Sequence, residues 1–147
     1  VVFCALTNLY LFAWRFYDLS RYSYPYYLHR DEVAALKWLE ENSPENAVIL
    51  SSLEVGQYIP GITGRRAFLA HWAQTLDFYK KREFVDHFYN TTIVSDTQLE
   101  TLKMFRVNYV ISNMDIPVNE FNGSSFSSVF SSENIQIFQI IYEGDGP

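Results

Sequence analysis

Residues 31–52 read DEVAALKWLEENSPENAVILSS, and this stretch decides the fold. Its first twelve residues repeat apolar side chains at helical spacing, which predicts an amphipathic helix over 31–42. Pro44 ends that helix, because proline cannot continue it. The uninterrupted apolar run AVIL, residues 47–50, then predicts a strand buried on both faces, as in parallel sheets. A helix followed by such a strand favours the α/β class.

The same alternation continues towards the C-terminus. Further helices are predicted over 77–89 and from a capping box of Ser95 and Gln98, strands over 66–70 and 107–112, a turn over 60–64, a loop over 119–128, and a closing hairpin from 128–130 and 135–141. The sequence therefore predicts an α/β fold. In detail we expect a three-layer αβα Rossmann-like domain with a short, mainly parallel or mixed sheet and a C-terminal hairpin.

Residues 1–14 carry no charge, which predicts the truncated end of a transmembrane helix. A complete span needs about 20 apolar residues, so this interpretation requires that the start of the helix is missing. A buried helix of a soluble fold and an uncleaved signal remnant are the alternatives. Residues 15–30 are rich in tyrosine and predict an aromatic interfacial linker, since Trp and Tyr gather at the membrane–water boundary. We therefore expect a membrane partner for the N-terminal segment and a soluble α/β domain over 31–147.

The net charge of that domain limits the kinds of partner it can bind. Residues 31–147 hold eight Lys and Arg against sixteen Asp and Glu. Such an acidic domain is a poor nucleic-acid binder and is repelled by an anionic cytoplasmic leaflet. We therefore expect the protein to be located at the cell membrane, with its soluble domain on the extracytoplasmic side. Cys4 is the sole cysteine, so neither an intrachain disulfide nor a cysteine-based metal cluster can form.

The candidate site lies where the first two predicted strands end, because ligands of open α/β sheets favour that edge. Its predicted ligand-binding residues are Glu54, Tyr58, His71, Trp72 and Thr75, with Ser51 and Ser52 beside them. Aromatic rings next to carboxylate, hydroxyl and imidazole groups can hold a sugar. The alternative is that the aromatic residues belong to the core or to an interface, and that the polar ones satisfy backbone groups.

Two further pairs of residues are weaker candidates for ligand binding. Arg65 and Arg66 could bind a phosphate, although adjacent arginines are also often solvated or paired with acids. Glu83 and His87 stand four residues apart on one predicted helix and could share a metal, but a third ligand is not evident. We therefore predict no metal site and no cofactor.

Established motifs add little. The glycines fit neither a dinucleotide-binding nor a P-loop pattern, and a G-x-S-x-G elbow is absent. Two triplets, at Asn90 and at Asn122, match the N-glycosylation pattern. They predict modification only in a secretory host. No catalytic residue is assigned.

Several motifs in this order resemble the soluble C-terminal region of bacterial and archaeal multi-pass membrane proteins similar to GT-C glycosyltransferases, which use lipid-phosphate-linked sugars. They are Trp38-Leu39, Gly56-Gln57-Tyr58-Ile59-Pro60, Gly64-Arg65-Arg66, His71-Trp72 with Thr75, and Tyr109-Val110-Ile111. The resemblance covers most of residues 15–142. It implies a domain type rather than a reaction. In such enzymes the catalytic carboxylate lies in an early extracytoplasmic loop, which is absent from this chain, as is the W-W-D-Y-G motif of oligosaccharyltransferases.

Three functions remain open from the sequence. The first is an extracytoplasmic accessory domain of a membrane glycosyltransferase-like protein, which helps to bind a sugar or a lipid-linked sugar and is not catalytic alone. The second is a structural or protein-interaction domain without a small-molecule site. The third, a free-standing soluble enzyme, is disfavoured by the missing motifs and the apolar start. The sequence does not predict an oligomeric state.

Overall fold

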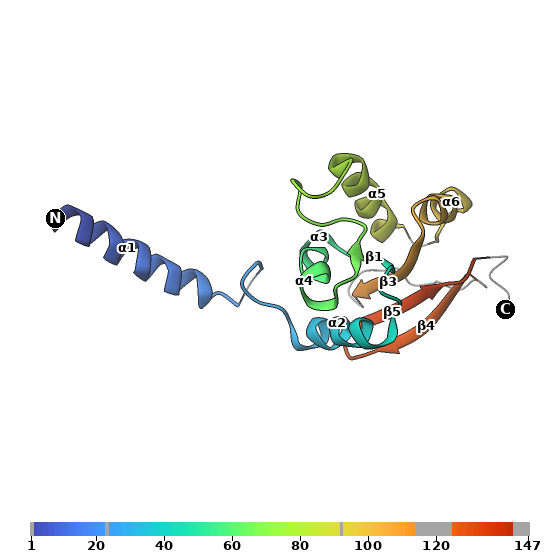
Figure 1. The fold of residues 1–147 in the computed structure, drawn as a ribbon, viewed down its shortest axis with the longest axis horizontal. Helices are drawn as coiled ribbons and strands as arrows, with labels where there is room; N and C mark the ends of the chain where they lie inside the picture. The colour runs from blue at the N-terminus through green and yellow to red at the C-terminus, as the bar shows by residue number, and fades with distance from the viewer. Residues whose placement is uncertain (1, 23, 92, 114–124, 143–147) are drawn as a thin grey trace. The chain divides into compact units, whose positions relative to one another are not determined.

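The computed structural model describes residues 2–22, 24–91, 93–113 and 125–142. The chain divides into two compact units, Val1–Arg30 and Asp31–Pro147 (Figure 1). Each unit has its own internal packing, so each is described by itself.

The first unit is built around the helix α1 (Val2–Leu19). From residue 5 onwards its apolar side chains are exposed; Leu9 and Phe12, for example, are 65% and 63% exposed. The helix runs through residues 15–19, which the sequence assigned to the linker, because no helix breaker occurs before Pro25. Arg15 donates a 3.1 Å hydrogen bond to the Tyr26 hydroxyl and so connects the helix to the following turn.

Among the residues that the structure describes, no helix combines the length and apolar character that a bilayer crossing requires. The interpretation of residues 1–14 as the cut end of a longer span stays a prediction.

The second unit alternates helices and strands as the sequence predicted. Its elements are α2 (Arg30–Asn42), β1 (Val48–Leu50), α3 (Leu53–Gly56), α4 (Ile59–Thr63), β2 (Arg66–Ala67), α5 (Phe78–Asn90), α6 (Asp96–Met104), β3 (Val107–Asn113), β4 (Phe126–Ser131) and β5 (Ile135–Ile140). The predicted capping box is confirmed: the Ser95 hydroxyl accepts from the Gln98 amide, and the Gln98 side chain accepts from the Ser95 amide.

The five strands form one mixed sheet in the order β2-β1-β3-β5-β4. β1 pairs in parallel with both β2 and β3, whereas β5 runs antiparallel to β3 and to β4. The predicted mixed α/β class and the C-terminal hairpin are therefore confirmed. A side chain strengthens the central pairing, since Asn108 Oδ1 accepts a 2.9 Å hydrogen bond from the Val48 amide, 60 residues away in the sequence.

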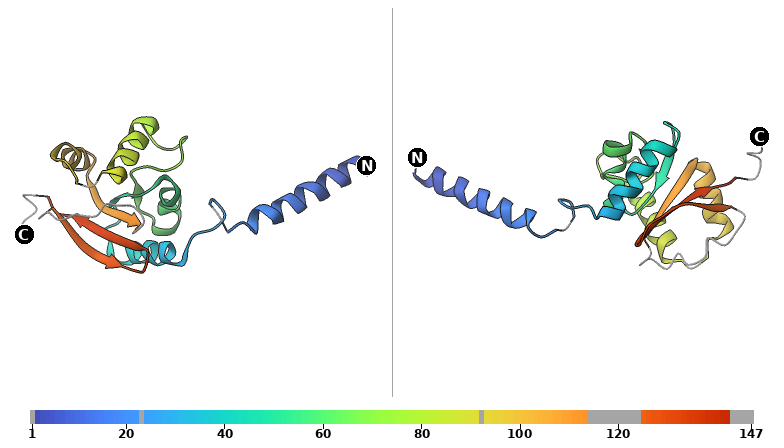
Figure 2. Two further views of the ribbon diagram at one scale, coloured as in Figure 1. Left: turned by 180° about the vertical axis from the view of Figure 1, so that it is seen from behind. Right: turned by 90° about the horizontal axis from the view of Figure 1, so that it is seen from below.

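Helices cover both faces of the sheet, and Figure 2 shows α2 and α5 on opposite sides of it. On the α2 side, Leu36 and Leu39 are fully buried, and Trp38 packs against Tyr109 and Phe130 at 6.3 Å and 6.0 Å between ring centroids. On the other side, α5 and α6 join the sheet in one core cluster. Its members are Val48, Leu50, Phe68, Leu69, Val85, Phe88, Tyr89, Leu102, Val107, Val110 and Ile140.

Three local predictions need correction. The predicted turn over 60–64 contains the short helix α4, because Pro60 fits the first turn of a helix and Gly64 closes it in the left-handed conformation at φ 68°. The predicted strand over 66–70 is only two residues long by its hydrogen bonds. The predicted loop over 119–128 ends earlier, since β4 begins at Phe126, while residues 119–124 lie outside the described residues.

Candidate functional site

A hollow of about 250 Å³ opens at the carboxyl end of β1. One wall follows the strand and consists of Ser52, Leu53 and Glu54; the other belongs to α5 and consists of Arg82, Val85, Asp86, Tyr89 and Asn90. Its position agrees with the sheet edge that the sequence indicated. Of the five predicted ligand-binding residues, Glu54 lines this hollow.

The first wall is shaped by the start of α3. The Ser52 hydroxyl accepts a hydrogen bond from the Val55 amide at 3.4 Å and caps the helix. Glu54 therefore lies in the first turn, where the positive end of the helix dipole favours a carboxylate. α3 ends at Gly56, where a Cβ atom would lie 2.1 Å from the Leu69 carbonyl oxygen. Glycine is thus required for α3 to lie this close to the chain that follows β2.

The second wall presents polar groups from successive turns of α5. Arg82 Nε lies 3.7 Å from Asp86 Oδ2, and Asn90 Nδ2 donates to the Asp86 backbone carbonyl at 2.7 Å. Tyr89 is anchored below them, because its hydroxyl donates a 2.6 Å hydrogen bond to the Ile111 carbonyl. Burial raises the pKa of the Tyr89 phenol, so this group stays protonated and serves as a donor.

Two carboxylates and one guanidinium thus face the hollow, in Glu54, Asp86 and Arg82. The site can accept hydrogen bonds from ligand hydroxyl or amide groups through the carboxylates and can donate through Arg82 and Asn90. Polyhydroxylated ligands satisfy both requirements at once. In the described part of the chain, no group of three His, Cys, Asp or Glu side chains could hold a metal ion.

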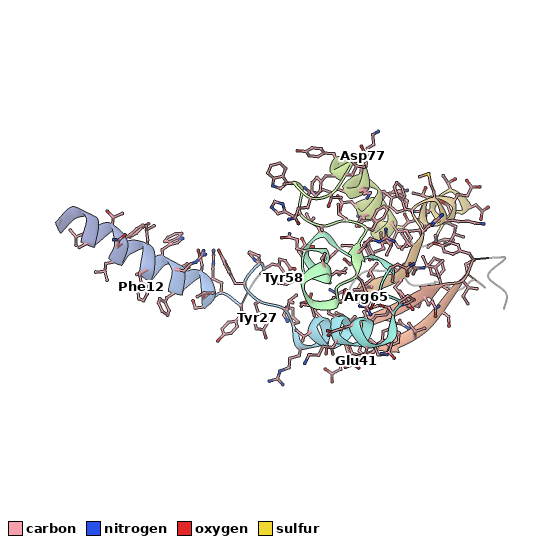
Figure 3. The ribbon with its side chains drawn as sticks, in the orientation of Figure 1. Phe12, Tyr27, Glu41, Tyr58, Arg65 and Asp77 are labelled. Carbon is pink, nitrogen blue, oxygen red and sulfur yellow. The ribbon has the colours of Figure 1, made fainter. Side chains whose placement is uncertain are left out.

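The other predicted ligand-binding residues lie outside this hollow. Tyr58 is half-buried between α3 and α4, where Figure 3 labels it. His71 and Trp72 are exposed and stack obliquely, with 5.6 Å between ring centroids. The Thr75 hydroxyl accepts a 3.1 Å hydrogen bond from the Ala70 amide and stabilises the turn. His71, Trp72 and Thr75 form one local group, and their role in ligand binding stays a prediction.

Arg65 has a structural position beside α2 (Figure 3). Its guanidinium donates to the backbone carbonyls of Glu40, Ser43 and Thr63, each at 2.7 Å, and to the Ser43 hydroxyl at 3.2 Å. The carbonyls of Glu40 and Ser43 lie at the end of α2 and that of Thr63 at the end of α4, where helical partners are lacking. Arg66 donates to the Asn46 carbonyl at 2.8 Å. Phosphate binding by the two arginines stays a prediction, and Arg65 would have to exchange its present acceptors for it.

The remaining candidates lie on α5. Glu83 and His87 are exposed on one face of this helix. Asn90, the first residue of one glycosylation triplet, is exposed at its end, while the triplet at Asn122 lies outside the described residues.

Arg82, Asp86 and Asn90 line the hollow but were not predicted as site residues. Their spacing of four residues along a predicted helix was the available signal, because such residues share one face. Arg82 was predicted to face water, Asp86 was given no role, and Asn90, just beyond the predicted helix, was named only as a glycosylation position. The sequence pattern could not show that this face turns towards the end of β1.

A likeness to known proteins is found at the level of structure. No family model matches the chain, and no curated protein sequence matches it. Among solved structures, the chain is similar to the C-terminal globular domain of an oligosaccharyltransferase from Archaeoglobus fulgidus. The TM-score is 0.60 at 13% sequence identity, and the match covers 78% of this chain and 99% of that domain. The predicted resemblance to such C-terminal domains is therefore confirmed as a likeness of fold.

Proposed function

We propose that this chain is an accessory domain of a membrane glycosyltransferase-like protein and helps to hold a sugar or a lipid-linked sugar. The observation that carries the proposal is the shared fold with the globular domain of an oligosaccharyltransferase, which this chain matches over nearly the whole of that domain. The polar hollow at Glu54 supports it, because carboxylates, an amide and a guanidinium are the groups that bind sugar hydroxyls.

The proposal includes attachment to a membrane through α1. Apolar side chains of α1 such as Leu9, Phe12 and Phe16 are more than half exposed, and their transfer from water into lipid is favourable. The acidic charge of residues 31–147 favours the extracytoplasmic side of the cell membrane. Catalysis belongs to other parts of the parent protein, so the 147-residue chain alone has no transferase activity.

The finer fold prediction, a three-layer αβα Rossmann-like arrangement, is part of the same proposal. Its support is the packing of α2 on one face of the sheet and of α5 on the other. The parallel pairing of β1 with both neighbours supports it as well.

A direct binding experiment tests the site. The ¹⁵N-labelled chain is titrated with N-acetylglucosamine 1-phosphate, and amide shift changes are mapped by NMR. We expect changes at Glu54, Asp86 and Asn90, and their loss in Glu54→Gln. The matched control is Glu100→Gln, which changes an exposed carboxylate on α6. Shift changes that leave the hollow untouched would contradict the proposed site.

A second experiment uses the full parent protein and measures sugar transfer. Removing one acceptor weakens binding by about 0.5–1.5 kcal/mol, so we expect Glu54→Gln to reduce transfer about twofold to tenfold. Trp72→Ala and its surface control Lys103→Ala test the aromatic residue in the same assay. Unchanged transfer in Glu54→Gln and Trp72→Ala, with both proteins folded, would favour the alternative of a structural or protein-interaction domain.

A further inference from the structure

The segment that follows β2 and runs into the first turn of α5 exposes three large apolar side chains. Trp72, Leu76 and Tyr79 are 68%, 82% and 81% exposed, far more than the half-buried Phe78 between them. We propose that this segment, residues 71–79, docks into the surface of a lipid bilayer and fixes which edge of the domain faces the membrane. The inference rests on the proposed membrane attachment.

The segment is ordered by its own hydrogen bonds. The Gln74 and Thr75 amides donate to the His71 carbonyl at 2.9 Å and 3.1 Å. The Thr75 hydroxyl closes the turn by accepting from the Ala70 amide. Trp72 is therefore held on a fixed turn and Tyr79 on the first turn of α5, so little ordering entropy opposes their docking.

The chemistry of the three side chains suits lipid. Trp and Tyr combine an apolar ring with a polar tip and are enriched at the membrane–water interface, while Leu favours the acyl chains. The exposed Lys80 follows Tyr79 directly and can reach lipid phosphates. The mixture is that of an interfacial anchor.

The size of the patch argues against a second copy of the chain as the occupant. Each aromatic side chain buries about 150–250 Å². Three side chains therefore fall short of the roughly 800 Å² per partner that a stable protein interface uses. Insertion into lipid has no such minimum area, because each inserted side chain contributes separately to the free energy of binding.

The tether between α1 and the domain allows a weakly binding docking segment to be effective. Residues 20–29 join α1 to α2, and ten extended residues reach at most about 36 Å. A domain held this close to the bilayer meets it at a high effective concentration, so two or three side chains are enough to keep it docked.

Docking would orient the site. β1 and β2 are parallel, so their carboxyl ends lie at the same sheet edge. The docking segment follows β2, and the hollow with Glu54 follows β1. A docked segment therefore turns that edge towards the membrane, where a lipid-linked ligand is found.

The test uses Trp72 as a reporter in the full chain. Trp14→Phe removes the tryptophan emission of α1. The emission of the half-buried Trp38 is measured in a Trp14→Phe, Trp72→Phe variant and subtracted. The probe is vesicles of the zwitterionic lipid phosphatidylcholine, with or without bromine on the acyl chains, because an anionic lipid would repel the acidic domain. We expect bromine to quench the Trp72 emission, since an interfacial side chain lies about 5–10 Å into the headgroup–acyl boundary. Leu76→Ser with Tyr79→Ser should weaken this quenching.

The matched control places tryptophan at another exposed apolar position. Ile93, 69% exposed, is replaced by Trp in the Trp14→Phe, Trp72→Phe background, and we expect no quenching. Flotation of the vesicles measures attachment through α1 separately. A chain that fails to float overturns the membrane proposal and this inference together. A chain that floats with unquenched Trp72 overturns this inference alone, as does a Trp72 emission that shifts with protein concentration in the absence of vesicles.

Discussion

The Tyr89 hydroxyl donates a 2.6 Å hydrogen bond to the backbone carbonyl of Ile111 and thereby joins α5 to the central strand β3. Tyr89 is 6% exposed, so its loss would leave the carbonyl in a nearly dry environment. We expect Tyr89→Phe to lower the free energy of unfolding by about 1–2 kcal/mol. Urea unfolding followed by circular dichroism measures it. An unchanged urea midpoint would show that this bond contributes nothing.

The same residue predicts an alkaline loss of stability. Burial raises the pKa of the Tyr89 phenol above its ordinary value of 10.0. Above pH 10 the unfolded chain therefore loses a proton that the folded chain keeps, so the free energy of unfolding falls as pH rises. Burial also raises the pKa of Tyr109, with the same sign.

Urea midpoints measured from about pH 8 to about pH 11 test this linkage. The Tyr89→Phe variant isolates the contribution of Tyr89 to this pH dependence. It is needed because Lys81 makes the free energy of unfolding rise with pH: burial lowers the pKa of Lys81, and nearby Asp77 partly offsets that shift. The variant should lose less stability over this range than the wild type. If the urea midpoints of the variant and the wild type fell in parallel with pH, Tyr89 would not be the source of the alkaline loss of stability.

Gly56→Ala tests the close approach of α3 to the chain after β2. The added methyl would meet the Leu69 carbonyl oxygen at 2.1 Å, so the backbone must move. Overpacking of this kind costs about 1–3 kcal/mol, occasionally more. Gly61→Ala is the matched control, because nothing lies within 4 Å of its added methyl and alanine favours helix. Equal thermal midpoints for the two variants would contradict the predicted clash.

Arg65→Ala tests the cap on α2. Removal of the guanidinium leaves the carbonyls of Glu40, Ser43 and Thr63 without a charged donor, so we expect a loss of about 1.5–3 kcal/mol. Arg66→Ala removes a single bond to the Asn46 carbonyl and should cost less. Calorimetric unfolding compares the two. A larger loss for Arg66→Ala would overturn this assignment.

Much of the fold could be predicted because buried apolar residues recur at regular spacing in the sequence. The apolar run over 47–50 and the heptapeptide β3 are buried on both faces, and both were predicted as strands. Short elements were less readable. β2 has two hydrogen-bonded residues, and α4 is built around a proline and two glycines that also favour turns.

The candidate site was predicted in part. The sheet edge and Glu54 followed from the position of β1, since ligand sites favour the carboxyl ends of strands. The facing residues Arg82, Asp86 and Asn90 could not be assigned, because the packing angle of α5 depends on Val85, Phe88 and Tyr89 meeting a core formed by distant strands. Periodicity predicts which helix face is buried and does not predict which loop lies beside the exposed face.

The hydrogen bond between Val48 and Asn108 has a consequence for synthesis of the chain. β1 leaves the ribosome first, and the partner strand that covers one of its edges follows 60 residues later. At about 5–20 residues per second, this interval lasts roughly 3–12 seconds. During that time one of the most apolar segments of the domain has an unpaired edge. β1 is therefore the segment that a nascent-chain chaperone would have most reason to shield.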